Sequence, residues 1–213
     1  MLIASYNPKN TGDTMVVIMS QDVANQEVAI HDHVARIFNS ADDTTLGYNF
    51  LQASDILPDV VKVNGRVHLS ADDVAKLNAY LQTHEFPGDI QLDNEPRFVV
   101  GYVKSMTDHP RSDHLKITQT EIDGGRELQI VSGSPNMRAD IKVVVAKVGA
   151  MMPDGMIIWP GELRGTESDG MICSGRELKL PNAPQAPGAL ILPDDFQEVG
   201  EPFDFDKAQH LFS

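Results

Sequence analysis

Residues 132–178 begin with Ser-Gly-Ser-Pro-Asn at positions 132–136 and end with Arg-Gly-Thr-Glu-Ser-Asp-Gly-Met-Ile-Cys-Ser-Gly-Arg-Glu-Leu at positions 164–178. An alternating apolar run over 142–149 and a turn-rich segment over 151–165 lie between the two motifs. Glycine has no Cβ, so it lets the backbone approach a ligand closely. Glycines, serines and an asparagine at fixed places beside short strands therefore predict a binding surface.

The sequence on both sides of this stretch predicts short β-strands. Five segments separated by turn signals fit a small barrel better than a layered α/β fold; they cover residues 98–104, 115–122, 127–131, 142–148 and 189–192. Only residues 136–141 interrupt them with the pattern of a helical turn. We therefore expect residues 91–206 to form an all-β OB-fold barrel of five strands with a long C-terminal extension.

The first 90 residues mix helical and strand patterns. A buried strand is expected over 14–19 and one or two more over 27–38. The clearest helix covers 71–84, because Ser70 can cap it and an apolar face repeats at helical spacing, at Val74, Leu77 and Leu81. Proline, glycine and acids over 86–96 end this periodicity. We expect an acidic α+β domain over 1–90.

Charge is distributed unevenly along the chain. The net charge is −14, which is unfavourable for a nucleic-acid binder overall. Residues 1–94 hold 13 acids and 5 basic residues, whereas residues 97–192 hold 11 of each. A polyanionic partner is therefore expected to contact the middle of the chain.

Three features bear on location. One cysteine, Cys173, cannot form an internal disulfide. The aliphatic run at 15–19 is far shorter than the roughly 20 residues of a membrane span, and the first residues lack a signal-peptide pattern. The cytoplasm is the expected location, without a membrane.

No motif of an enzyme or cofactor site occurs in the sequence. It contains no P-loop, dinucleotide fingerprint, HExxH helix or GxSxG elbow. His109, Asp113 and His114 are close in sequence but lack the further ligands of a zinc site. Cys173 has no CxxC partner and fits a small semi-buried residue. We expect no catalysis, no metal and no cofactor.

Three ordered motifs carry a resemblance to a known family: His-Pro-Arg-Ser-Asp-His-Leu at 109–115, Ser-Gly-Ser-Pro-Asn at 132–136 and Arg-Gly-Thr-Glu-Ser-Asp-Gly-Met at 164–171. Together they resemble the EMAP-II-like tRNA-binding OB domain. The ending at 171–178 resembles the branch near the N-terminus of the bacterial phenylalanyl-tRNA synthetase β subunit. With its acidic first segment, the chain resembles the YtpR family of bacterial tRNA-binding proteins.

The resemblance implies that the barrel binds tRNA by shape and backbone contacts. It places Ser168, Met171 and Asn136 at or beside the RNA surface, where hydroxyl and amide groups suit phosphate and 2′-OH contacts. Further candidates supply charge or, for the tryptophan, stacking on a base: Arg164, Arg111, Lys116, Lys104 and Trp159. Asn136 also fits a structural role that orients its own loop, and we favour that role for it.

The sequence departs from the family at two places. His114 stands where relatives carry a lysine, and 157–163 lacks the lysines that relatives commonly carry before Arg164. Fewer cations reduce the counterion release on which RNA affinity depends. The alternative function is therefore a protein-interaction module with weak or no RNA affinity. The acidic first domain repels phosphate, so protein binding or self-association is expected there.

Overall fold

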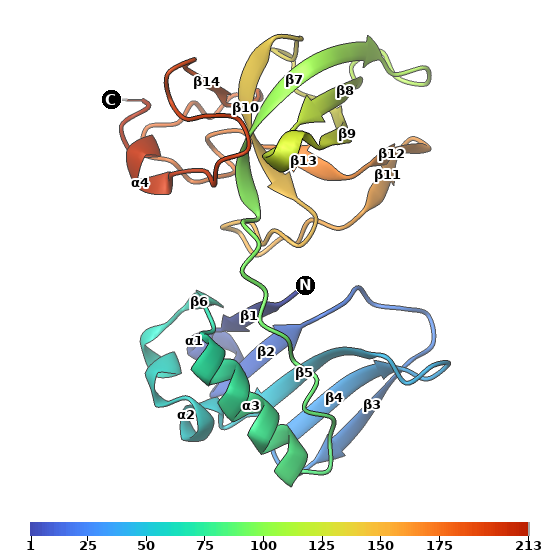
Figure 1. Ribbon diagram of the computed structural model, residues 1–213, viewed down its shortest axis with the longest axis vertical. Helices are drawn as coiled ribbons and strands as arrows, with labels where there is room; N and C mark the ends of the chain where they lie inside the picture. Colours follow the sequence, from blue (N-terminus) through green and yellow to red (C-terminus); the bar gives the residue numbers. More distant parts are fainter. Residues whose placement is uncertain (213) are drawn as a thin grey trace. The chain divides into compact units, whose positions relative to one another are not determined.

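The computed structural model describes residues 1–212. The chain forms two compact units, of which the first covers Met1–Asn94 and the second begins at Glu95 (Figure 1).

An antiparallel six-stranded sheet forms most of the first unit, in the order β3-β4-β5-β2-β1-β6. Its strands are β1 (Ile3–Tyr6), β2 (Thr14–Ile18), β3 (Gln26–His31), β4 (Val34–Asn39), β5 (Thr45–Leu51) and β6 (Gly65–Val67). Its helices are α1 (Pro8–Thr11), α2 (Ala53–Ile56), the 3-10 helix η1 (Pro58–Lys62) and α3 (Ala71–Thr83). The α+β prediction thus holds only coarsely, because strands dominate the unit. The expected strands at 14–19 and 27–38 are present, the latter as two.

Helix α3 covers one face of this sheet (Figure 1). Ser70 and Asp73 form a reciprocal capping box, in which each side chain accepts a hydrogen bond from the other residue's backbone N–H. Val74, Leu77 and Leu81 are buried as their spacing predicts, and they pack with Tyr48 and Phe50 of β5 in one core. The predicted helix and its buried face are therefore confirmed.

A nearly closed antiparallel barrel forms the second unit, in the strand order β13-β10-β7-β8-β9. The strands are β7 (Phe98–Asp108), β8 (Lys116–Glu121), β9 (Glu127–Ser132), β10 (Ile141–Lys147), β11 (Gly161–Leu163), β12 (Thr166–Ser168), β13 (Gly170–Ile172) and β14 (Ile191–Leu192). The 3-10 helix η2 (Asp123–Gly125) follows β8, and α4 (Phe205–Ala208) lies near the C-terminus.

The sheet has six strands, one more than expected: the strand predicted at 189–192 is present as β14, and β13 is the additional strand. Gly170–Ile172 pairs with β10, and 191–192 pairs with another part of the same strand as β14. Sequence patterning missed β13 because three residues are too few to show alternation. Residues 136–141 contain a turn and bends instead of the helical turn that we expected, and Met137 is buried in the barrel core there.

Side chains alternate across the barrel wall. Val99, Val143 and Val145 belong to the interior cluster, whereas Val100 and Val144 lie on the outer face. That outer face is covered by the C-terminal extension, through residues including Leu180, Phe196 and Phe203. Cys173 is fully buried there, and burial raises the pKa of its thiol. This environment fits an unreactive packing residue.

A buried lysine of the barrel forms hydrogen bonds with a glutamate at the start of the second unit and with an aspartate. Lys147 is 4% exposed, and its Nζ donates to Glu95 Oε1 at 2.8 Å and to Asp123 Oδ1 at 3.2 Å. The hydrogen bond from Lys147 is the main cause that holds the pKa of Glu95 below its usual value. Burial raises the pKa of Asp123, but hydrogen bonds from Arg126 and Lys147 outweigh it, so this pKa is also lowered.

We predict that Lys147→Met will lower the free energy of unfolding of this unit at neutral pH by roughly 1–3 kcal/mol, as for hydrogen bonds to charged groups. Both carboxyl pKa values are depressed in the folded protein. Their contribution is therefore present above the ordinary values of 4.5 and 3.8, and is lost as pH falls through the folded values. The stability difference should shrink on acidification.

The measurement is denaturant unfolding followed by the fluorescence of Trp159, the one tryptophan of the sequence, which lies in this unit. Parallel stability profiles of the two proteins between pH 7 and strong acid would contradict the role given to Lys147.

Candidate nucleic-acid interface

His109 joins two hairpins of the second unit. It is 3% exposed at the end of β7, and its Nδ1 accepts a hydrogen bond from the Arg111 backbone N–H at 3.0 Å. Its Nε2 lies 3.1 Å from the carbonyl oxygen of Leu163 in β11. A carbonyl only accepts, so the neutral ring with its hydrogen on Nε2 satisfies both contacts. The ring thereby joins the 109–115 loop to the β11–β12 hairpin.

We call this junction, residues 109–115 and 161–168, the hairpin clasp. Two arginines, one from each segment, contact the opposite segment. Arg164 Nη1 donates to the backbone oxygen of Arg111 at 3.0 Å. The Arg111 guanidinium lies against Gly165, where a Cβ would be 1.8 Å from Nη2. Arg164 and Gly165 both have left-handed backbone, with φ of 49° and 76°. The Arg164 guanidinium is therefore hydrogen-bonded within the clasp, and the Arg111 guanidinium lies against the second hairpin.

The clasp arginines remain available to an anion. Both residues are exposed, and within residues 1–212 neither forms an ion pair with a carboxylate. A hydrogen bond from His114 is the main cause that lowers the pKa of Asp113, and the charge of Arg164 adds to it. A phosphate that binds here would not first have to displace an ion-paired carboxylate.

The two candidate lysines are already paired with carboxylates. Lys116 at the start of β8 pairs with Asp108 of β7. Lys104 occupies the register shift of β7 and pairs with Glu127 at 2.7 Å and Glu121 at 3.5 Å. Hydrogen bonding to Glu127 is the main cause that raises the pKa of Lys104. Phosphate would have to compete with these carboxylates.

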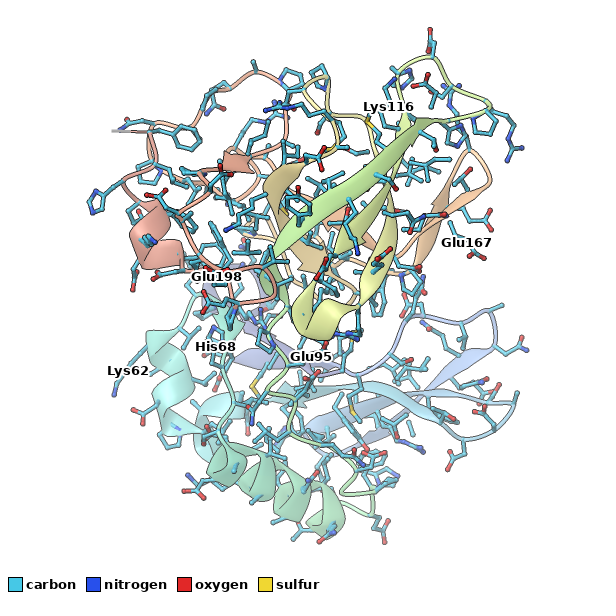
Figure 2. The ribbon with its side chains drawn as sticks, turned by 45° about the horizontal axis from the view of Figure 1, so that its top comes forward. Lys62, His68, Glu95, Lys116, Glu167 and Glu198 are labelled. Atoms are coloured by element: carbon cyan, nitrogen blue, oxygen red, sulfur yellow. The ribbon has the colours of Figure 1, made fainter. Side chains whose placement is uncertain are left out.

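An uncharged polar pair lies on β8 and β9, beside the clasp. Gln119 and Gln129 are directly opposite in the strand register, with their side chains 3.4 Å apart. Gln129 Nε2 also donates to the Glu167 backbone oxygen of β12 at 2.9 Å. Figure 2 labels Lys116, at the start of β8, and Glu167, in β12, which mark the two hairpins β7–β8 and β11–β12. The two glutamines were not among the residues expected at the site; their signal in the sequence is the alternation of Gln119 with the buried Thr118 and Thr120.

Ser168 has a structural position in the barrel seam. It is 5% exposed, and its hydroxyl accepts from Val131 N–H of β9 at 3.1 Å and donates to the Gly170 carbonyl at 3.1 Å. Next to it, Asp169 N–H donates to the Gln129 carbonyl at 2.9 Å. These bonds join β9 to the β12–β13 segment, so the Ser168 hydroxyl is occupied within the protein.

The remaining candidates do not gather on the clasp. The Asn136 amide forms two hydrogen bonds with the backbone of Ala189: Oδ1 accepts from the N–H at 2.8 Å, and Nδ2 donates to the carbonyl oxygen at 2.9 Å. This fits the loop-orienting role that we favoured for Asn136. Met171 is half-buried against the outer-face core. Trp159 is half-buried just before β11. Residues 1–212 contain no cluster of three metal-ligating side chains.

We predict that Ser168→Ala will destabilise the second unit by roughly 1–3 kcal/mol, because it leaves the buried Val131 N–H without an acceptor. Trp159 fluorescence during denaturant unfolding measures the change. Ser168→Thr retains the hydroxyl and serves as the comparison. A stability equal to the wild type in Ser168→Ala would show that the seam does not need this bond.

Comparison with known proteins assigns both units to described families. Residues 21–93 match a domain of unknown function, DUF4479, and residues 98–202 match a family described as "Putative tRNA binding domain". A phenylalanine–tRNA ligase β subunit of Nitratidesulfovibrio vulgaris is 44% identical over 99 residues, which cover 46% of this chain and 12% of that subunit. A β subunit from Sulfurimonas denitrificans is 51% identical over 84 residues, covering 39% of this chain and 11% of that subunit.

A further relative matches both units. The "Putative tRNA-binding protein YtpR" of Bacillus subtilis is 42% identical over 204 residues, covering 95% of this chain and 99% of the relative. The identity extends through both units and is not confined to the barrel. The chain therefore belongs to the YtpR family.

Proposed function

We propose that the protein binds tRNA without catalysis, through the hairpin clasp and the adjoining face of an OB-fold barrel. The observation that carries this proposal is the clasp itself, where Arg164 donates to the Arg111 backbone and the Arg111 guanidinium lies against Gly165, and where neither arginine is ion-paired with a carboxylate of residues 1–212. OB folds bind nucleic acids with their second and third strands and with the loops that follow the first and fourth strands. Here these are β8, β9, the 109–115 loop and the segment containing β11–β12.

In this proposal the two arginines contact phosphates, and the polar strand face contacts the sugar backbone. Guanidinium groups suit phosphate because they donate two parallel hydrogen bonds. Gln119 and Gln129 carry amides that can both donate to and accept from 2′-hydroxyls. Neither kind of contact reads a base, so folded RNA shape would be recognised. The names of the relatives agree with tRNA as that RNA.

The first unit has another role in this proposal. Its 13 acids against 5 basic residues repel phosphate, so a protein partner or self-association fits it better than RNA.

Residues 1–212 contain no helix long and apolar enough to cross a membrane. Cytoplasmic tRNA would be the natural partner, and we place the protein in that compartment.

One observation favours the alternative of a protein-interaction module. Lys104 and Lys116 are paired with carboxylates, so two of the four candidate cations bring no unpaired charge to the surface. A titration of purified protein with unfractionated tRNA separates the two functions, with a single-stranded oligonucleotide and an RNA hairpin as competitors. Saturable binding that prefers tRNA supports the proposal. No binding at low salt would favour the protein-interaction module.

We predict that Arg111→Ala and Arg164→Ala will each weaken tRNA binding about tenfold, because a charge-assisted hydrogen bond contributes roughly 1.5 kcal/mol or more. Each variant should also reduce the slope of log affinity against log salt by about 0.7–0.9, the amount for one phosphate contact. Lys104→Ala should have a smaller effect because Glu127 already neutralises it. Lys76→Ala, on α3 of the acidic unit, is the charge-matched control.

We also predict that Gly165→Ala will weaken tRNA binding although it removes no charge. The new Cβ would overlap Nη2 of Arg111, so the guanidinium must move. Gly125→Ala is the matched control, because its φ of 73° is close to the 76° of Gly165 but no atom lies within 4 Å of the new Cβ. In the double variant with Arg111→Ala, Gly165→Ala should add little. Fully additive losses would exclude displacement of Arg111 as the cause.

A further inference from the structure

Strand β3 is an open edge of the sheet in the first unit. It covers Gln26–His31 and, among the strands of residues 1–212, pairs with β4 alone, at one end of the strand order (Figure 1). Antiparallel pairing uses the N–H and C=O groups of alternate residues on each side of a strand. Every second residue of β3 therefore directs its backbone polar groups toward the open edge, where they can pair with another strand.

The side chains of this edge are unusually apolar for an exposed strand. Ile30 and Val28 are 65% and 57% exposed, the highest values among the large hydrophobic residues of the described chain. They share one face of β3, because side chains alternate along a strand. Ala29 between them packs toward the core under α3. The exposed pair therefore lies on the face of the sheet opposite α3.

The two edges of this sheet differ in their protection against pairing. Natural edge strands avoid pairing by being short, by carrying charged residues, especially lysine, or proline, or by containing a bulge. At the other edge, β6 is only three residues long and has Arg66 at its centre. Strand β3 is six residues long, has no lysine or proline, and pairs with β4 in unbroken register. Its one acidic residue, Glu27, is the only one of these protective features that it carries.

We propose that β3 pairs antiparallel with β3 of a second copy of this chain, about a two-fold axis at Ala29. In this register Val28 of one copy lies opposite Ile30 of the other on the exposed face. Glu27 lies opposite His31 on the α3 face, so that no carboxylate of the strand meets its own counterpart. Aliphatic cross-strand pairs stabilise such ladders, and a two-fold axis uses the same patch on both copies. This self-complementarity favours a second copy as the occupant.

Salt provides a signature of this contact. Each first unit carries an excess of 8 acids, so two copies repel each other at long range, and added salt screens this repulsion. The strand pairing itself is backbone hydrogen bonding and apolar contact, which salt does not screen. Self-association should therefore strengthen with salt, whereas RNA binding should weaken.

The test is sedimentation equilibrium of the nuclease-treated full chain over a range of protein and salt concentrations. We expect the average mass to rise toward twice the monomer mass as protein concentration increases. In high salt this rise should occur at a lower protein concentration than in low salt. Val28→Lys and Ile30→Lys should keep the chain monomeric. Val61→Lys, at a 55% exposed residue of η1, is the matched control and should still dimerise. A monomer under all conditions, or a dimer that both β3 variants retain, would overturn the proposal.

A cross-link tests the register. Directly opposite residues of an antiparallel pair have Cα atoms roughly 4.5–5.5 Å apart, within the range of a disulfide. Ala29→Cys should therefore form a disulfide-linked dimer on mild oxidation, and Val61→Cys should not. The native Cys173 is fully buried and does not interfere. Equal cross-linking of the two variants would contradict the assigned axis.

Discussion

The arrangement of the candidate surface depends on how the barrel closes between β9 and the β12–β13 segment. Three hydrogen bonds cross this seam, from the Val131 backbone to Ser168, from Asp169 to the Gln129 carbonyl, and from the Gln129 side chain to Glu167. A buried hydroxyl thus replaces part of a backbone ladder. Because the seam fixes one end of the β11–β12 hairpin and His109 fixes the other, the hairpin has little freedom. The clasp is therefore preorganised before any ligand arrives.

Sequence patterning found the elements whose periodicity extends over several turns or alternations. Helix α3 has apolar residues at helical spacing with a serine cap, and β10 is a long aliphatic run, so both were predictable. Strand β13 and the β11–β12 hairpin each have three-residue strands, which carry almost no periodic signal. Strand β5 was missed because Gly47 and Asn49 interrupt its apolar pattern, although neither prevents pairing with two neighbours.

The candidate site could be predicted from the sequence only in part, for a different reason. The family resemblance and the residue types point to arginine, lysine, serine and asparagine as RNA contacts, but the sequence does not show which of these polar groups form hydrogen bonds within the protein. Ser168 and Asn136 are satisfied internally by Val131, Gly170 and Ala189. Lys104 is likewise occupied, because a register shift in β7 places it beside two glutamates. These partners are distant in sequence, so only tertiary structure reveals them.

Local pairing matters more than the net charge of −14 for affinity toward a polyanion. Screening limits the reach of surface charges to roughly 8–10 Å at physiological salt, so distant acids contribute little at the clasp. A phosphate there would meet two guanidinium groups, of which that of Arg164 is hydrogen-bonded to the Arg111 backbone and that of Arg111 lies against Gly165. A lysine held by two carboxylates offers much less, because displacing them costs about as much attraction as the phosphate returns. In the function that we propose, the strength of RNA binding is therefore governed by the cations of residues 1–212 that have no acidic partner.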